Sequence, residues 1–172
     1  MKPEYVLAIF IGVAAFSVYV ALDMNGGSLD FSDRQLTLVV TNSMDGDITD
    51  YDVDSFPADT LVIIQHLPDN EVRLLRVGDV ISYHDGSMLI HHRIVQVNSD
   101  SFYVRGDNGH STDKVMFDEV NGLVVGTNPL LGHVVSWISS HFLVFVGTML
   151  ALCMLFFTLS MYLPQKNSKE AD

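Results

Sequence analysis

Apolar residues form two long runs, one near each end of the chain, and between these runs they occur in short segments separated by polar residues, Gly and Pro. The first run, Tyr5–Leu22, holds 18 residues without a charge. As a helix rising about 1.5 Å per residue, it is nearly long enough to cross a hydrocarbon core. The second run, Val134–Leu163, contains no Asp, Glu, Lys or Arg and is densest over Phe142–Leu163. Its length and small polar face favour a membrane span over a buried core helix.

We therefore expect an N-terminal transmembrane anchor over residues 1–24, and a C-terminal transmembrane helix with a short cytoplasmic tail over residues 134–172. A cleaved secretory signal is the alternative at the N-terminus. It is disfavoured because Lys2 is set against Glu4 and the DMNGG that follows the run lacks an A-x-A site. Lysines in both tails mark them as cytoplasmic, so the middle region faces outward, across the cell membrane or, in a eukaryote, the endoplasmic reticulum membrane.

Residues 25–133 show short β-branched and apolar segments separated by Gly, Asp, Asn and Pro, which is typical of strands and turns. Asp85-Gly86-Ser87 fits a three-residue hairpin loop. The pattern predicts an antiparallel sheet, so the expected fold is a membrane-anchored, mainly β protein with its β domain between two transmembrane helices. The expected strands are Leu36–Thr41, Thr60–Gln65, Val80–His84, Met88–Val97, Phe102–Arg105 and Leu123–Gly126.

Charge and cysteine content exclude one class of function and one kind of cross-link. The net charge of −12 argues against nucleic-acid binding, which requires clustered Lys and Arg. The single cysteine, Cys153, lies inside the second apolar run, so no intramolecular disulfide can form.

Seven histidines suggest a metal site, with His84, His91, His92 and His110 in the middle region. Adjacent residues of a strand point to opposite faces, so His91 and His92 would not both reach one ion. The chain has no HExxH or paired CxxC motif. A zinc site is therefore disfavoured, and no cofactor is expected.

A serine nucleophile needs a base, a group that orients the base, and donors for the developing oxyanion. Ser43, then His92, then Asp107 or Asp113 occur in an order that supplies the first two needs. Ser, His and Asp are common residues, so their order indicates a catalytic site only if the residues around them also fit one.

Four segments in this order, TNSMDGD, FPADTLVII, VGDVISYHDGSMLIHHRIV and YVRGDNGHSTD, resemble the ordered boxes of type I signal peptidases of the archaeal and endoplasmic-reticulum branch. The likeness runs from Thr41 to Asp113. The bacterial branch of that family places Lys where this chain has His92. The only lysine of the middle region is Lys114, which directly follows Asp113. An imidazole with a pKa near 6.5 can act as a base at neutral pH without a large shift.

The resemblance implies a signal-peptidase-like catalytic domain and a membrane-bound serine endopeptidase that removes signal peptides from secreted and membrane-protein precursors. It implies Ser43 as nucleophile and His92 as general base. Asp113 is favoured as the triad acid, with Asp107 as a supporting or alternative acid. The oxyanion donors would be the Ser43 backbone N–H and the Thr41 hydroxyl, although Thr41 also fits an ordinary β-branched strand residue.

The chain departs from the family pattern beside the nucleophile. Asn42 replaces the usual Gly, and Asp45-Gly46 replaces an acidic-Pro pair, yet both keep a tight turn feasible. The competing hypothesis is a catalytically inactive, membrane-anchored β domain that binds extracellular partners. For the enzyme, the expected partners are signal-peptide-bearing precursors, the lipid bilayer, and secretion machinery or accessory subunits.

Overall fold

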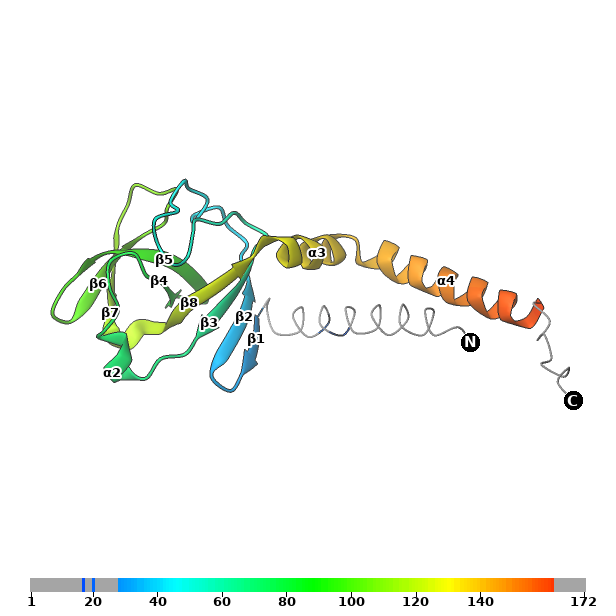
Figure 1. The fold of residues 1–172 in the computed structure, drawn as a ribbon, viewed down its shortest axis with the longest axis horizontal. Helices are drawn as coiled ribbons and strands as arrows, with labels where there is room; N and C mark the ends of the chain where they lie inside the picture. Colours follow the sequence, from blue (N-terminus) through cyan, green and yellow to red (C-terminus); the bar gives the residue numbers. More distant parts are fainter. Residues whose placement is uncertain (1–16, 18–19, 21–27, 163–172) are drawn as a thin grey trace, which may run out of the picture.

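The computed structural model describes residues 17, 20 and 28–162 of the chain. The predicted N-terminal anchor, residues 1–24, lies outside the described residues apart from two positions. Figure 1 shows a β domain from which two helices extend at one end. The strands of this domain form one eight-stranded sheet in the order β1-β2-β3-β8-β4-β5-β6-β7, and every neighbouring pair is antiparallel.

The prediction of a mainly antiparallel β architecture is confirmed. The sheet is built from strands β1 (Ser28–Phe31), β2 (Arg34–Leu38), β3 (Leu61–Gln65), β4 (Val80–Asp85), β5 (Met88–Val97), β6 (Ser101–Arg105), β7 (Asp113–Met116) and β8 (Val120–Asn128). The helices are α2 (Asp69–Val72), the 3-10 helix η1 (Phe117–Glu119), α3 (Pro129–Ser140) and α4 (Phe142–Tyr162).

The strand predictions are accurate where a segment is rich in apolar and β-branched residues and fail where strands are short and polar. Strand β5 has the predicted bounds, whereas β1 and β7, four residues each and both carrying charge, were not predicted. The predicted strand Leu36–Thr41 ends early, at Leu38. Val39 still exchanges backbone hydrogen bonds with Thr60 and Asp59, and the chain then enters the loop that carries Ser43. The predicted three-residue hairpin loop is a two-residue turn, because Asp85 pairs with Met88 and Gly86 takes a φ of 61°.

Two groups of buried side chains form the core, and β4 contributes to both. Val80 belongs to the first group, while Ile81 and Tyr83 belong to the second. This alternation sends neighbouring residues of β4 and β5 to opposite faces of the sheet. The first group comprises Val39, Met44, Val53, Phe56, Val62, Ile64, Val80 and Val124, and the second Val72, Leu75, Ile81, Tyr83, Ile94, Phe102, Val104 and Val115.

The uncharged C-terminal stretch forms two helices. Helix α3 begins before the predicted boundary because the Asn128 side chain caps it, accepting from the Leu131 N–H at 2.9 Å, and Pro129 follows at the first turn. The chain then bends at His141, and α4 follows. In the described part of the chain no single helix is long and apolar enough to cross a membrane. By length and composition α3 and α4 pass that test together, with a bend of 88° between them.

Candidate active site

The loop between β2 and β3 carries Ser43. The next residue, Met44, anchors this loop in the core. Met44 is fully buried, and its carbonyl accepts hydrogen bonds from the Phe56 N–H at 2.9 Å and the Gly46 N–H at 3.1 Å. Asn42, the first departure from the family pattern, braces the same loop, because its Oδ1 accepts from the Ala58 N–H at 2.7 Å. Ser43 is thus presented half-buried between two anchored residues.

A second loop clamps the Ser43 loop from the other side. Residues 106–109 form a turn closed by a 2.8 Å hydrogen bond from the Gly109 N–H to the Gly106 carbonyl. The Asn108 N–H donates to the Ser43 carbonyl at 3.0 Å, and Asn108 Nδ2 donates to the Asn42 carbonyl at 3.3 Å. The Gly-Asp-Asn segment therefore fixes the backbone of the Ser43 loop, a role that its turn chemistry suits.

Two glycines allow this close approach. A Cβ on Gly106 would lie 2.5 Å from the Ser43 carbonyl oxygen and 3.1 Å from His92 Nε2. A Cβ on Gly46, part of the second departure, would lie 2.9 Å from Asp107 Cβ. Gly106 is therefore a shared neighbour of Ser43 and of His92 Nε2. Gly46 lies where the Ser43 loop touches Asp107, and the absence of a side chain at Gly46 leaves room for that contact.

His92 lies on β5 directly opposite Ile81 of β4. Its Nδ1 is 3.0 Å from the Tyr83 hydroxyl and 3.5 Å from Asp113 Oδ2, and the same hydroxyl donates to Asp113 Oδ2 at 3.2 Å. Its Nε2 faces Gly106 and thus the Ser43 loop. The Nδ1 atom of the imidazole therefore faces the Asp113 carboxylate, and the Nε2 atom faces the loop of the candidate nucleophile.

The Ser43 hydroxyl points toward Thr41, with 3.3 Å between Ser43 Oγ and Thr41 Oγ1. Among the described residues, no hydrogen bond joins Ser43 Oγ to His92, and the Ser43 backbone N–H donates to no protein acceptor. A change of the Ser43 χ1 rotamer would redirect Oγ. Catalytic hydrogen bonds are often long or misaligned before substrate binds, so this arrangement is compatible with a resting enzyme.

Burial lowers the pKa of His92 below its usual value of 6.5, and the nearby Asp113 and Asp107 carboxylates oppose that effect. The ring is therefore neutral at pH 7 and able to accept a proton. Burial also raises the pKa of Tyr83, with a further contribution from Asp113, so its hydroxyl keeps its proton.

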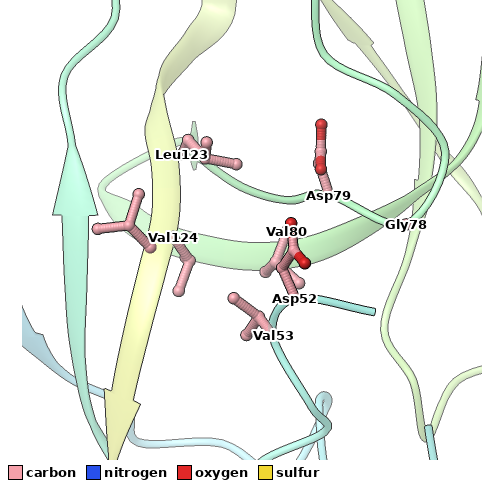
Figure 2. Close-up of a pocket in the computed structure, with 8 residues that line it drawn as sticks. Asp52, Val53, Gly78, Asp79, Val80, Leu123 and Val124 are labelled. Atoms are coloured by element: carbon pink, nitrogen blue, oxygen red, sulfur yellow. The ribbon is translucent and has the colours of Figure 1, made fainter. Parts of the chain in front are cut away.

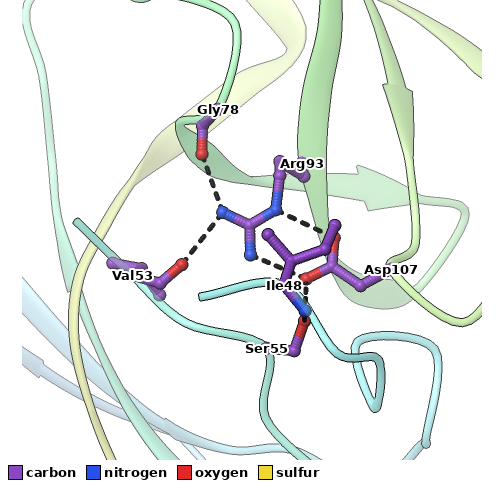
Figure 3. A network of polar contacts seen from close by, with 6 residues as sticks. All are labelled: Ile48, Val53, Ser55, Gly78, Arg93 and Asp107. Carbon is purple, nitrogen blue, oxygen red and sulfur yellow. Dashed lines mark hydrogen bonds and ion pairs between the residues drawn. The ribbon is translucent and has the colours of Figure 1, made fainter. Parts of the chain in front are cut away.

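The two candidate acids occupy different environments. Asp113 is 52% exposed and lies beside His92, whereas Asp107 is 1% exposed and binds Arg93. Arg93 Nε donates to Asp107 Oδ1 at 2.9 Å and Nη2 to Oδ2 at 2.6 Å, while Ser55 Oγ donates to Oδ2 at 2.7 Å. Figure 3 shows this network, in which Arg93 Nη1 also donates to the carbonyls of Val53 and Gly78.

A pocket of about 170 Å³ lies close to this network, between the Val53 segment and strands β4 and β8 (Figure 2). Val53 and Gly78, whose carbonyls bind Arg93, both line it. None of the predicted catalytic residues lines this pocket, so it is separate from the candidate active site.

The histidines of the metal hypothesis do not converge. His91 Nδ1 is 2.8 Å from Ser82 Oγ, while His92 contacts Tyr83, so the two rings lie on opposite faces of the hairpin as alternation predicts. His84 and His110 are exposed. Within residues 28–162 and the other described positions, no group of three or more His, Cys, Asp or Glu side chains is arranged to hold a metal ion.

The sequence alone did not single out Tyr83 or the Arg93–Asp107 pair. The observed two-residue turn places Tyr83 diagonally from His92 on the same face, whereas the predicted three-residue loop would have put Tyr83 on the opposite face. A scan against protein-family models and a search of curated proteins each give no match to this chain.

Proposed function

We propose that this protein is a membrane-bound serine endopeptidase that removes signal peptides from secretory and membrane-protein precursors. One observation carries the proposal. The His92 ring lies between an acidic group at Nδ1 and the Ser43 loop at Nε2, which is the order of a Ser-His-Asp triad. The ordered resemblance from Thr41 to Asp113 supplies the substrate class.

In the proposed reaction, His92 Nε2 takes the proton of Ser43 Oγ as this oxygen attacks a peptide carbonyl. Asp113 stabilises the resulting imidazolium. The protonated ring then gives its proton to the leaving amine, and water releases the acyl group from Ser43. The Ser43 N–H, which has no protein acceptor among the described residues, and the Thr41 hydroxyl would bind the oxyanion.

The sheet offers a place for an extended substrate beside His92. Strand β6 pairs with β5 only from Arg93 onward, whereas residues 88–92 pair with β4 on their other side. An extended peptide can add to such a strand edge through backbone hydrogen bonds. A substrate bound there would run beside His92, which suits a precursor whose cleavage segment is extended.

The proposed membrane location rests on the two apolar runs of the sequence and on the lysines in both tails. Attachment of enzyme and precursor to the same membrane would raise their effective concentration. The proposal places the β domain on the extracytoplasmic side, where the end of a signal helix emerges.

The test is cleavage of a membrane-inserted precursor by the full chain and by single variants Ser43→Ala, His92→Ala and Asp113→Ala. Matched controls are Ser99→Ala and His84→Ala, which remove exposed side chains of the same types. We expect the first two variants to lose nearly all activity and the controls to keep it. Full cleavage by Ser43→Ala would refute the proposal.

Two further measurements separate the competing classes. An acylating inhibitor should label Ser43 in the enzyme and should not label a β domain that only binds partners. A chelator should leave cleavage unchanged, whereas a metal-dependent protease would lose activity and tolerate Ser43→Ala.

A further inference from the structure

The Tyr83 hydroxyl lies between the imidazole of His92 and the carboxylate of Asp113. It is 3.0 Å from His92 Nδ1 and 3.2 Å from Asp113 Oδ2, whereas the direct separation of Nδ1 and Oδ2 is 3.5 Å. A separation of 3.5 Å is too long for a strong hydrogen bond between a ring N–H and a carboxylate. The hydroxyl therefore makes the shorter polar contact to each partner.

The available protons allow one arrangement in which both contacts are hydrogen bonds. A phenol has one O–H to donate, and a carboxylate can only accept. In that arrangement the Tyr83 hydroxyl donates to Asp113, and its oxygen accepts from His92 Nδ1. The neutral imidazole must then carry its proton on Nδ1, which leaves the Nε2 lone pair facing Gly106 and the Ser43 loop.

The hydroxyl is also held in place. Tyr83 is 6% exposed and belongs to the buried group with Ile81 and Ile94, and its ring centre is 5.9 Å from that of His92. The pairing of β4 with β5 makes the two residues diagonal neighbours on one face. Packing of the ring therefore fixes the hydroxyl between its two partners, and burial keeps it protonated by raising its pKa.

We propose that Tyr83 is a positioning residue that links His92 to Asp113 and holds the imidazole in the Nδ1–H tautomer, with Nε2 ready to accept the proton of Ser43. The catalytic part of this inference rests on the proposed endopeptidase function. The tautomer part does not, because it concerns hydrogen bonds in the resting protein. During the reaction the imidazolium would donate to the Tyr83 oxygen, while Tyr83 continues to donate to Asp113, so no proton leaves the tyrosine.

The first experiment measures the tautomer directly. Long-range ¹H–¹⁵N spectra of the full chain in detergent micelles, with ¹⁵N-labelled histidine, distinguish protonated from unprotonated ring nitrogens, and His92→Gln assigns the signals. We expect His92 to carry its proton on Nδ1 in the wild type and to shift toward the Nε2–H form in Tyr83→Phe. The matched control, Tyr103→Phe, changes another tyrosine of the sheet and should leave the His92 signals unchanged.

The second experiment measures catalysis. Tyr83→Phe keeps the packed ring and should lower kcat roughly 10- to 100-fold with little change in KM, the size expected for loss of one hydrogen bond to a charged group. A merely structural role would instead lower the thermal midpoint and the amount of active enzyme, leaving the kcat of the folded fraction unchanged. Tyr103→Phe should keep wild-type kcat.

The outcomes separate the two proposals. An Nε2–H tautomer in the wild type, or an unchanged tautomer and kcat in Tyr83→Phe, overturns the role of Tyr83 and leaves the Ser43 proposal intact. Full cleavage by Ser43→Ala overturns the endopeptidase, and the tautomer measurement then still decides whether Tyr83 orients His92. The wild-type spectrum alone can refute the inference, so the inference stays testable even if a variant fails to fold.

Discussion

Arg93 and Asp107 form a bidentate ion pair inside the β domain, with N–O distances of 2.9 Å and 2.6 Å. Arg93 immediately follows His92 on β5, and Asp107 immediately follows Gly106 in the loop that touches Ser43. The pair therefore ties the strand of the proposed base to the loop that holds the proposed nucleophile. Its side chains are 3% and 1% exposed, so each charge depends on the other for compensation.

Asp107 and Asp113 should respond differently to the same substitution by Asn. Asp107→Asn leaves Arg93 without its buried partner charge, and we expect it to lower the free energy of unfolding by about 3–5 kcal/mol. Asp113→Asn changes a half-exposed carboxylate and should leave stability nearly unchanged while lowering kcat strongly. Urea unfolding and precursor-cleavage kinetics on the full chain, measured for both variants, check this.

Asp100→Asn provides the control, because Asp100 is an exposed carboxylate in the β5–β6 turn. This substitution should change neither the free energy of unfolding nor kcat by much. A stable Asp107→Asn protein with a kcat defect like that of Asp113→Asn would contradict this division of roles and would make Asp107 the acid.

Gly106→Ala should reduce activity by displacing the Ser43 loop. The added Cβ would lie 2.5 Å from the Ser43 carbonyl oxygen, a distance at which backbone must move. A shift of the loop by even part of an ångström misplaces a nucleophile, so we expect kcat to fall by about 100-fold. Gly126→Ala is the control, because within the described part of the chain its Cβ would meet only Ile63 Cδ1, at an ordinary contact distance of 3.6 Å. Equal kcat values for the two variants would refute the proposed packing of this loop.

The extent to which the sequence predicts the fold depends on how local the determinants are. Strand β5 follows from its apolar and β-branched residues and from the turn residues before it, so its bounds were predicted. Strand β7 has the sequence DKVM, too short and polar to show a pattern, and it forms because β6 supplies a partner. The break at His141 does have a compositional signal, because it follows Ser139-Ser140 and comes just before Phe142, where the apolar run becomes densest.

The candidate site shows the same limit. The ordered motifs predict Ser43, His92 and Asp113 as site residues, and the structure places Asp113 near His92 and the Ser43 loop next to Gly106. The partners of Asp107 could not be chosen in this way. Arg93 and Ser55 reach it from separate segments through tertiary packing, which no local pattern encodes.

The acid limb of the pH–rate profile should reflect the buried environment of His92. The base must be neutral to act, so kcat/KM is lost as pH falls through the pKa of His92 in the free enzyme. Burial lowers that pKa below 6.5, and Asp113 is the largest opposing cause. We expect a midpoint below pH 6.5 in the wild type, and a still lower midpoint with a smaller maximum rate in Asp113→Asn. Precursor cleavage measured across the acidic range checks this, and a wild-type midpoint above 6.5 would contradict it.

His91 should make stability depend on pH without affecting catalysis directly. It is 5% exposed, and burial lowers its pKa from 6.5 to about 4. In the unfolded chain the ring takes up a proton near pH 6.5, so the unfolded state binds more protons between these values and the folded state loses stability as pH falls from 6.5 to 4. The loss from this one group is on the order of 3 kcal/mol.

The variant His91→Gln keeps a polar group near Ser82 but does not titrate. The free energy of unfolding of this variant should therefore fall less between pH 6.5 and pH 4 than that of the wild type. Urea unfolding of both full-length chains at several pH values measures the difference, and parallel curves would show that His91 is not the group responsible.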